Sequence, residues 1–138
     1  MKQISSFLVI FFVCFFQIAS ADNSRDLQDI CQLTLEMSSL DKYYHIDKLP
    51  ERKPLLILKN EYTNHEPDLF KFGEKVKYVS RNGIYEKSRN YFEFSKIEIS
   101  GNSAYVEFLY PPEGLVGKVN FVKDELGWHI KNHKIVER

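Results

Sequence analysis

Cysteine is scarce in this chain of 138 residues, which contains only Cys14 and Cys31. Cys14 lies in an N-terminal apolar segment that we expect to be removed, so Cys31 is left without a partner for an intramolecular disulfide. Small secreted domains that lack a core usually depend on disulfides, and this domain must depend on packing instead. We expect Cys31 to be a buried small hydrophobe, and an intermolecular disulfide or a reactive thiol is the alternative.

An excess of charge of either sign is also missing. The chain has 19 lysine and arginine residues against 19 aspartate and glutamate residues, without a charge block or a low-complexity tract. This balance gives no reason to expect nucleic acid or an anionic membrane as a partner.

Sequence motifs of known chemistry are lacking as well. There is no Ser-His-Asp order with an elbow glycine, no phosphate loop and no cysteine-histidine metal spacing. We therefore predict no catalytic residues, no cofactor and no metal site. The sequence also has no Asn-x-Ser/Thr sequon, which favours a bacterial periplasm over a eukaryotic secretory route.

The N-terminus has the pattern of a Sec-type signal peptide. Lys2 is followed by an apolar run, residues 7–16, and then by Ala19-Ser20-Ala21. The run is about half of the roughly 20 apolar residues that a membrane span needs, so we expect no stable span after cleavage. The prediction is a signal peptide over residues 1–21, a single α+β domain over residues 22–138, and a periplasmic or secreted location.

A helix is predicted from Ser24 to about Tyr44, because apolar residues recur there at spacings of three and four. Its stripe consists of Leu27, Ile30, Cys31, Thr34, Met37 and Leu40. Residues 55–58 read as a strand and residues 67–73 as one helical turn closed by Gly73. Residues 75–80 read as a strand that the Asn82-Gly83 turn could pair with residues 84–86.

The last third predicts a meander of four strands, because apolar residues alternate over residues 91–99, 104–110, 115–121 and 128–136. Phe92 and Phe94 have the opposite parity to Ile97 and Ile99, so we expect a bulge near Ser95-Lys96 to restore one buried face. In the final strand Trp128, Ile130 and Val136 share one parity, and His129, Lys131, His133 and Ile135 share the other. Residues four apart on a strand are separated by about 13 Å. We therefore expect His129 and His133 to be solvated rather than joint ligands of one zinc ion, whose adjacent ligand atoms lie within about 4 Å of each other.

These elements predict an α+β fold in which an N-terminal helix packs on a curved antiparallel sheet of about five or six strands. The order resembles the cystatin-like or NTF2-like superfold. The resemblance rests on the strand from Gly101 to Phe108, with its Ala-x-Val-x-Phe pattern, and on Gly127-Trp128-His129-Ile130. It implies fold only, since such sheets host enzymes, ligand carriers, inhibitors and immunity proteins.

The densest polar and aromatic stretch is residues 41–48, at the expected end of the helix. His45 between Asp41 and Asp47 could form an acid–base pair, but a cationic histidine stabilised by the helix dipole explains the same pattern. Residues 50–54, Pro-Glu-Arg-Lys-Pro, read either as a solvated linker or as a loop that docks an acidic partner. The candidate binding residues are Tyr43, Tyr44, His45, Arg52 and Lys53.

We favour a non-catalytic exported binding protein that contacts another protein in the periplasm, such as an immunity or inhibitor protein. Aromatic and arginine anchors would carry most of the binding energy. The alternative is an NTF2-like carrier of a small molecule, or an enzyme, with a pocket between helix and sheet and with His45 or Tyr43 at its mouth. The lining of that pocket would be Phe92, Phe94, Tyr110 and Trp128. A structural or envelope-assembly role stays open.

Overall fold

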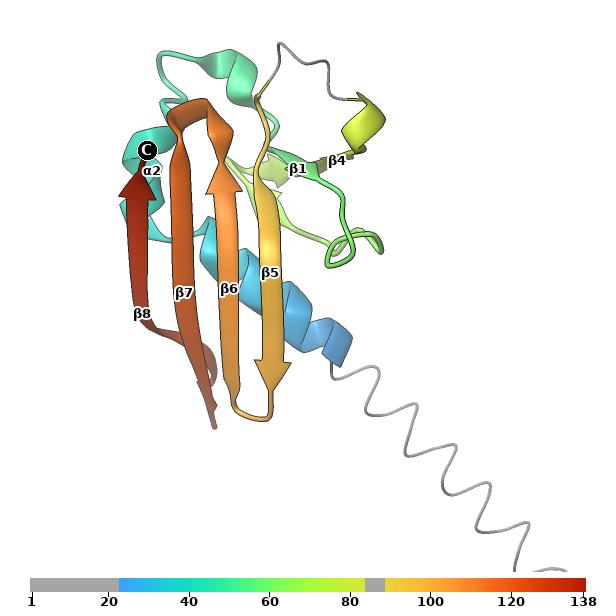
Figure 1. Cartoon of the computed structure of the whole chain (residues 1–138), viewed down its shortest axis with the longest axis vertical. Coiled ribbons are helices and arrows are strands. Elements are labelled where there is room, and N and C mark those ends of the chain that lie inside the picture. The colour runs from blue at the N-terminus through green and yellow to red at the C-terminus, as the bar shows by residue number, and fades with distance from the viewer. Residues whose placement is uncertain (1–22, 84–88) are drawn as a thin grey trace, which may run out of the picture.

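A four-stranded antiparallel sheet forms the centre of the computed structural model, which describes residues 23–83 and 89–138 (Figure 1). Its strands follow one another in space as they do along the chain, so the predicted meander is confirmed. They are β5 (Glu93–Ser100), β6 (Ser103–Tyr110), β7 (Leu115–Asp124) and β8 (Gly127–Glu137). The α+β class is confirmed with them.

A bulge in β5 restores a single buried face, as the sequence predicted. Phe94 is opposite Phe108 and Lys96 is opposite Glu107, which leaves Ser95 as the extra residue. Phe94 and Ile97 are both buried in spite of their opposite parity. The extra residue reverses the alternation of side chains, and this reversal keeps the apolar residues on the core side.

A second bulge, in β8, was not predicted. Asn132 is opposite Asn120 but Ile130 is opposite Phe121, so Lys131 is unmatched. The bulge reverses the faces of the residues that follow it, and the predicted grouping of Val136 with Trp128 and Ile130 is wrong. Ile135 packs against the core instead, whereas Val136 is exposed.

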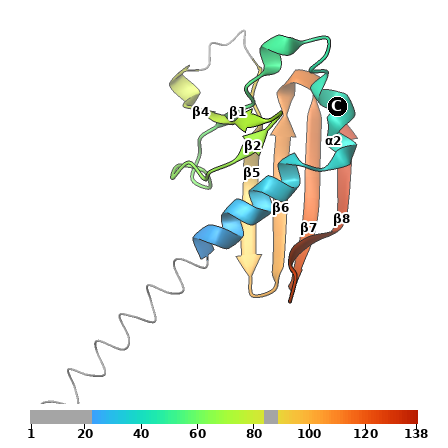
Figure 2. The ribbon, with the colours of Figure 1, turned by 180° about the vertical axis from the view of Figure 1, so that it is seen from behind.

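Two helices replace the single helix predicted up to Tyr44. Helix α1 covers residues 23–35 and α2 covers Ser38–Tyr44. Met37, with ψ of 123°, is extended between them and is buried. The serines that follow it favour helix ends over interiors, and the break lets both helices bury apolar residues. Seen from behind, α1 crosses the sheet (Figure 2).

Asp26 of α1 joins this helix to the sheet. Its Oδ1 accepts hydrogen bonds from Trp128 Nε1 and Lys123 Nζ, both at 2.9 Å, and its side chain is 14% exposed. Burial alone would raise the pKa of Asp26, but the hydrogen bonds from Trp128 and Lys123 and the lysine charge together lower it.

We expect Asp26→Asn to lower the free energy of unfolding at about pH 7 by about 1–3 kcal/mol, because a charge-assisted hydrogen bond is lost. A carboxyl whose folded pKa is lowered stabilises above its unfolded pKa of 3.8, and this stability is lost as the pH falls through the folded pKa. Urea unfolding should therefore separate the variant from wild type at about pH 7, and the difference should shrink progressively as the pH falls below 3.8. The matched control is Asp29→Asn, at an exposed position on the same helix. An equal effect of both variants, or a pH-independent difference, would refute the assignment.

Short elements extend the sheet on the β5 side. Strand β1 (Leu56–Leu58) pairs in parallel with β4 (Lys77–Val79), and Ile57 forms a parallel bridge with Phe92. The strand at residues 55–58 is thus confirmed. The expectation of one antiparallel sheet of five or six strands is wrong, because four strands are antiparallel and the β1–β4 pair joins them in parallel. The described residues also form three short 3-10 turns, of which the last connects β6 to β7: η1 (Pro50–Arg52), η2 (Arg81–Gly83) and η3 (Pro111–Glu113).

A small hairpin replaces the helical turn predicted over residues 67–73. Strands β2 (Phe70–Lys71) and β3 (Glu74–Lys75) are antiparallel and are joined by Phe72 and Gly73. Both connecting residues have positive φ, at 58° and 76°, as a tight two-residue hairpin turn requires. Asn82 and Gly83 lie in η2, and residues 84–86, predicted to pair with the preceding strand, fall outside the described residues.

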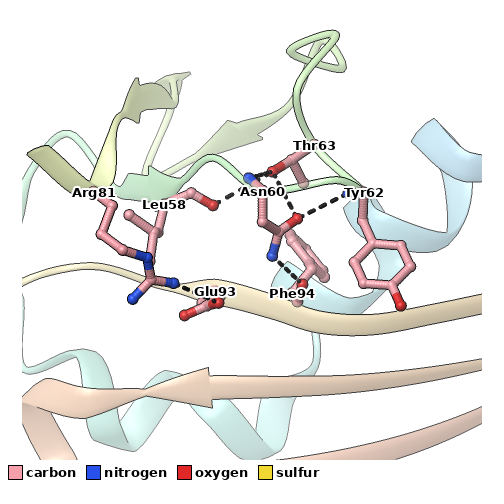
Figure 3. Close-up of polar contacts among 7 residues, drawn as sticks. All are labelled: Leu58, Asn60, Tyr62, Thr63, Arg81, Glu93 and Phe94. Carbon is pink, nitrogen blue, oxygen red and sulfur yellow. Dashed lines mark hydrogen bonds and ion pairs between the residues drawn. The ribbon is translucent and has the colours of Figure 1, made fainter.

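The loop after β1 is fixed to the bulge of β5 by Asn60 (Figure 3). Asn60 Nδ2 donates to the carbonyl of Phe94 at 2.7 Å, and Asn60 Oδ1 accepts from the backbone N–H of Tyr62 at 2.9 Å. Thr63, which is fully buried, donates to the carbonyl of Leu58 at 3.3 Å. The Asn60 amide therefore supplies a partner to a carbonyl beside the bulge, where the regular ladder is interrupted.

We expect Asn60→Ala to lower the free energy of unfolding by about 1–3 kcal/mol, because the carbonyl of Phe94 loses its donor. Asn64, an exposed asparagine of the same loop, is the matched position, and Asn64→Ala should stay within about 0.5 kcal/mol of wild type. Chemical denaturation followed by circular dichroism measures both. Equal stability of the two variants would show that the Asn60 amide does not anchor the loop.

Candidate functional site

The predicted binding residues of the 41–48 stretch separate into buried and exposed groups. Tyr44 is only 1% exposed and belongs to the core, so its expected place as a surface aromatic is wrong. Its ring contacts those of Phe72 and Tyr110 edge to face, at centroid distances of 5.1 and 5.3 Å. Tyr43 is half-buried beneath the ammonium of Lys42, which lies 4.8 Å from the ring centroid.

Arg52 is a structural clamp rather than a free surface cation. Its Nη1 donates to the carbonyls of Tyr43 and Tyr44 at 3.2 Å each, and to Glu113 Oε1 at 2.8 Å. The side chain is 13% exposed. Arg52 thereby satisfies carbonyls at the end of α2, which a helix leaves without intrahelical partners. Lys53, by contrast, is exposed, and its role in binding stays a prediction.

His45 ends α2 in the left-handed conformation, with φ of 52°. Its carbonyl accepts from the backbone N–H groups of Lys48 and Leu49, and its exposed ring lies 3.6 Å from Glu113 Oε1. The nearest carboxylate to His45 is therefore Glu113 of η3, which the sequence did not suggest, rather than Asp41 or Asp47. The acid–base pair considered for His45 with these aspartates has no hydrogen bond to support it among the described contacts.

A groove lies beside α2 and its C-terminal turn, and we call it the α2 groove. Its volume is about 470 Å³, which falls within the range of about 300–1,000 Å³ that is common for ligand sites. The rim consists of exposed charged side chains, and the floor is formed by buried and half-buried residues. The lining residues are Asp41, Lys42, Tyr44, His45, Ile46, Asp47, Lys48, Lys71 and Phe72.

Lys71, from the β2–β3 hairpin, lies at the floor of the groove with a side chain only 12% exposed. Its Nζ is 3.2 Å from Asp41 Oδ1, and it lies 4.9 and 5.5 Å from the ring centroids of Tyr44 and Phe72. Two aromatic faces and one carboxylate therefore hold this cation. Sequence reasoning missed Lys71 and Phe72, because it assigned residues 67–73 to a helical turn. The single available signal was Gly73, which fits a hairpin as well as a helix end.

Three of the four residues predicted to line a pocket between helix and sheet are packed in the core. Phe92, Phe94 and Tyr110 are at most 1% exposed. Phe92 lies 5.0 Å from Phe94 and 6.2 Å from Tyr110, measured between ring centroids. Trp128 is also buried and donates to Asp26. Phe92, Phe94 and Tyr110 are thus part of the core. Trp128 instead lines a hollow of about 270 Å³ beside α1, together with Asp29, Gln32, Leu33, Leu126 and Gly127.

The two C-terminal histidines lie on a strand, as predicted, and both are exposed. The β8 bulge places them on opposite faces of the sheet, because His129 is opposite the exposed Val122 and His133 is opposite the buried Val119. His129 Nε2 is 2.9 Å from Asp124 Oδ1, and this contact, followed by the backbone N–H of Leu126, lowers the pKa of Asp124. Among residues 23–83 and 89–138, no group of three His, Cys, Asp or Glu side chains is placed to hold a metal ion.

Cys31 is fully buried in α1, as predicted for a residue of the apolar stripe. Burial raises the pKa of its thiol to about 12, so the thiol stays protonated at neutral pH. A protonated, buried thiol is a poor nucleophile, and the arrangement supports a packing role. The part of the chain that the structure describes contains no helix long and apolar enough to cross a membrane.

Comparisons of the chain with protein-family models, with curated proteins and with solved structures found no match.

Proposed function

We propose that this protein is a small exported binding protein without a catalytic role, and that it acts by contact with another protein in the periplasm. An immunity or inhibitor protein is one concrete form of this function. Export rests on the signal-peptide pattern of residues 1–21, which lie outside the described residues. The α2 groove is the centre of the proposed contact surface.

The observation that carries the proposal is the composition of the α2 groove. Two segments separated in sequence, residues 41–48 and 71–72, meet there, and charges of both signs surround a floor of aromatic rings. Interfaces between proteins combine an anchoring pocket with a polar rim in this way. Of the residues predicted for binding, His45 lines this groove from its rim and Tyr44 contributes to its floor.

A carrier or enzyme with a pocket between helix and sheet was the alternative, and the packing of Phe92, Phe94 and Tyr110 in the core favours the binding protein over it. The rings of Phe92 and Phe108 are stacked 5.0 Å apart, which leaves no room for a ligand between them. The likeness to the cystatin-like or NTF2-like superfold belongs to this proposal. It is supported by a helix across an antiparallel meander, and the parallel β1–β4 pair is a departure from it.

The proposal is tested by capture of the partner in the source organism. The whole chain, with its own N-terminal segment and a C-terminal affinity tag on a flexible linker, is crosslinked gently and purified from the exported fraction. We expect one protein to co-purify in near-stoichiometric amount. A paired chain with Lys42→Glu and Lys48→Glu on the groove rim should lose that protein, whereas Lys131→Glu and Lys134→Glu on β8 should retain it. A preparation without a protein partner would overturn the proposal.

A further inference from the structure

The ammonium of Lys71 has more hydrogen-bonding capacity than its surroundings use. A lysine ammonium carries three N–H donors, and the one acceptor found for it among the described residues is Asp41 Oδ1 at 3.2 Å. The cation is at the floor of the α2 groove, whereas Asp41 is at the rim with a side chain 62% exposed. The Lys71 side chain as a whole is 12% exposed, and the α2 groove that it lines is the open side from which a further acceptor can approach its ammonium.

The charged residues that line the groove favour an anionic ligand. The lining contains three lysines and two aspartates, and His45 adds a further hydrogen-bond donor at the rim. The lysines are Lys42, Lys48 and Lys71, and the aspartates are Asp41 and Asp47. Asp41 is the one carboxylate bonded to Lys71, and its exposure leaves it free to turn toward solvent when another carboxylate takes its place. The rings of Tyr44 and Phe72 fix the position of the ammonium through cation–π contacts. These contacts do not require a second carboxylate, so N–H donors of Lys71 stay available for a ligand.

The backbone of the groove is held in an uncommon conformation. Phe72 has a φ of 58°, a region in which a bulky residue is seldom found, and His45 has a φ of 52° as the left-handed cap of α2. Phe72 stands at a hairpin position where Asn, Asp or Gly is usual, and its ring is packed edge to face on Tyr44. Such conformations cost free energy and cluster at functional sites. Here the conformation of Phe72 places its ring beside Tyr44 and Lys71.

We propose that the α2 groove binds the carboxylate side chain of a glutamate or aspartate presented by the protein partner, with Lys71 Nζ as its principal donor. This inference rests on the proposed function and names the chemistry of its partner. The carboxylate accepts a charge-assisted hydrogen bond from Lys71 in place of Asp41, or together with it, while Lys48 and His45 lie at the rim beside the flanking residues of the partner.

The probe is the peptide N-acetyl-Gly-Glu-Gly-amide, titrated at millimolar concentration into the whole mature chain labelled with ¹⁵N. We expect saturable shifts in the amide signals of residues 41–48 and 71–72. The matched peptide with glutamine in place of glutamate should cause no such shifts, because it lacks the negative charge. Sodium acetate should bind more weakly than the glutamate peptide. If acetate binds as tightly, the groove accepts free carboxylates without regard to a protein partner, and that result would overturn the proposal.

Lys71→Met should weaken the binding of the glutamate peptide by about tenfold or more, since the principal charged donor is lost. The control is Lys75→Met on the adjacent strand β3, where the lysine is exposed and paired with Asp68 outside the groove. Because Lys71→Met could disturb the hairpin, Lys71→Arg is measured beside it and should keep most of the affinity. Unchanged binding by a folded Lys71→Met protein would refute the role of Lys71. If that variant still captured the cellular partner, the inference would fail while the proposed function stood.

Discussion

Phe92→Ala is expected to lower the free energy of unfolding by about 3–5 kcal/mol, the usual cost of removing a buried phenylalanine ring. Phe92 is fully buried, and its ring lies 5.0 Å from those of both Phe94 and Phe108. Its backbone also joins β1 to the main sheet, since its N–H donates to Leu56 and its carbonyl accepts from Leu58. The substitution keeps this backbone and removes the ring, so the loss reports on packing.

The matched control for this prediction is Phe70→Ala. Phe70 is 51% exposed, and the same change of side chain there should cost about 0.5 kcal/mol or less. Urea unfolding at neutral pH, followed by tyrosine and tryptophan fluorescence, gives both values. A cost at Phe92 no greater than that at Phe70 would contradict the placement of Phe92 at the centre of the core.

Gly117→Ala is expected to destabilise the protein by about 3 kcal/mol, the upper part of the usual cost of overpacking a core. Gly117 is opposite Phe108 in the β6–β7 pairing, and the Phe108 ring lies directly over it. A Cβ atom at position 117 would stand 2.1 Å from two carbons of that ring. The ring is stacked on Phe92 at an interplanar angle of 19°, so it cannot move aside without disturbing the core.

Two comparisons isolate the steric cause. Gly83→Ala should be nearly neutral, because among the described residues the new Cβ would meet Ser80 Oγ alone, at an ordinary contact distance of 3.4 Å. Replacing Phe108 by leucine in the Gly117→Ala chain should recover part of the lost stability. The effects of the two substitutions on the free energy of unfolding should therefore be non-additive. Thermal unfolding of wild type, Gly117→Ala, Phe108→Leu and the double variant measures the coupling between the two positions. A neutral Gly117→Ala, or strict additivity with Phe108→Leu, would contradict the close approach of ring and glycine.

The C-terminal sheet was predictable because alternation with a period of two records which face of a strand is buried. The bulge at Ser95 could be predicted because Phe94 and Ile97 are apolar on both sides of it. The bulge at Lys131 gave no such signal, since exposed polar residues occupy both parities of β8 between Ile130 and Ile135. Its position is fixed by the pairing with β7 and not by local preference.

The break at Met37 escaped prediction because the apolar spacing continues through it, so that one long helix and two short ones have the same pattern. The β2–β3 hairpin escaped prediction for a different reason. Phenylalanine at a turn position with φ of 58° is intrinsically unfavourable, and only its contact with Tyr44 shows why it is tolerated there.

The candidate site was predictable in part. The stretch at residues 41–48 was recognised by its density of charged and aromatic residues, and His45 does line the groove. Tyr44 and Arg52 were wrongly expected on the surface. Sequence alone cannot distinguish an exposed tyrosine from one packed in the core, or an exposed arginine from one bonded to the carbonyls at the end of a helix. Lys71 could not be found, since its distance from residue 41 along the chain gives no hint of the 3.2 Å contact.

The most direct test of the account is site-specific crosslinking from the α2 groove in the source organism. A photoactivatable residue replaces Lys48 on the groove rim in one chain, and replaces Lys131 on the β8 bulge in another. We expect a single crosslinked protein in high yield from position 48, little from position 131, and loss of the position-48 product when Lys71→Met is added. Equal products from both positions, or none from position 48, would contradict a contact surface centred on this groove.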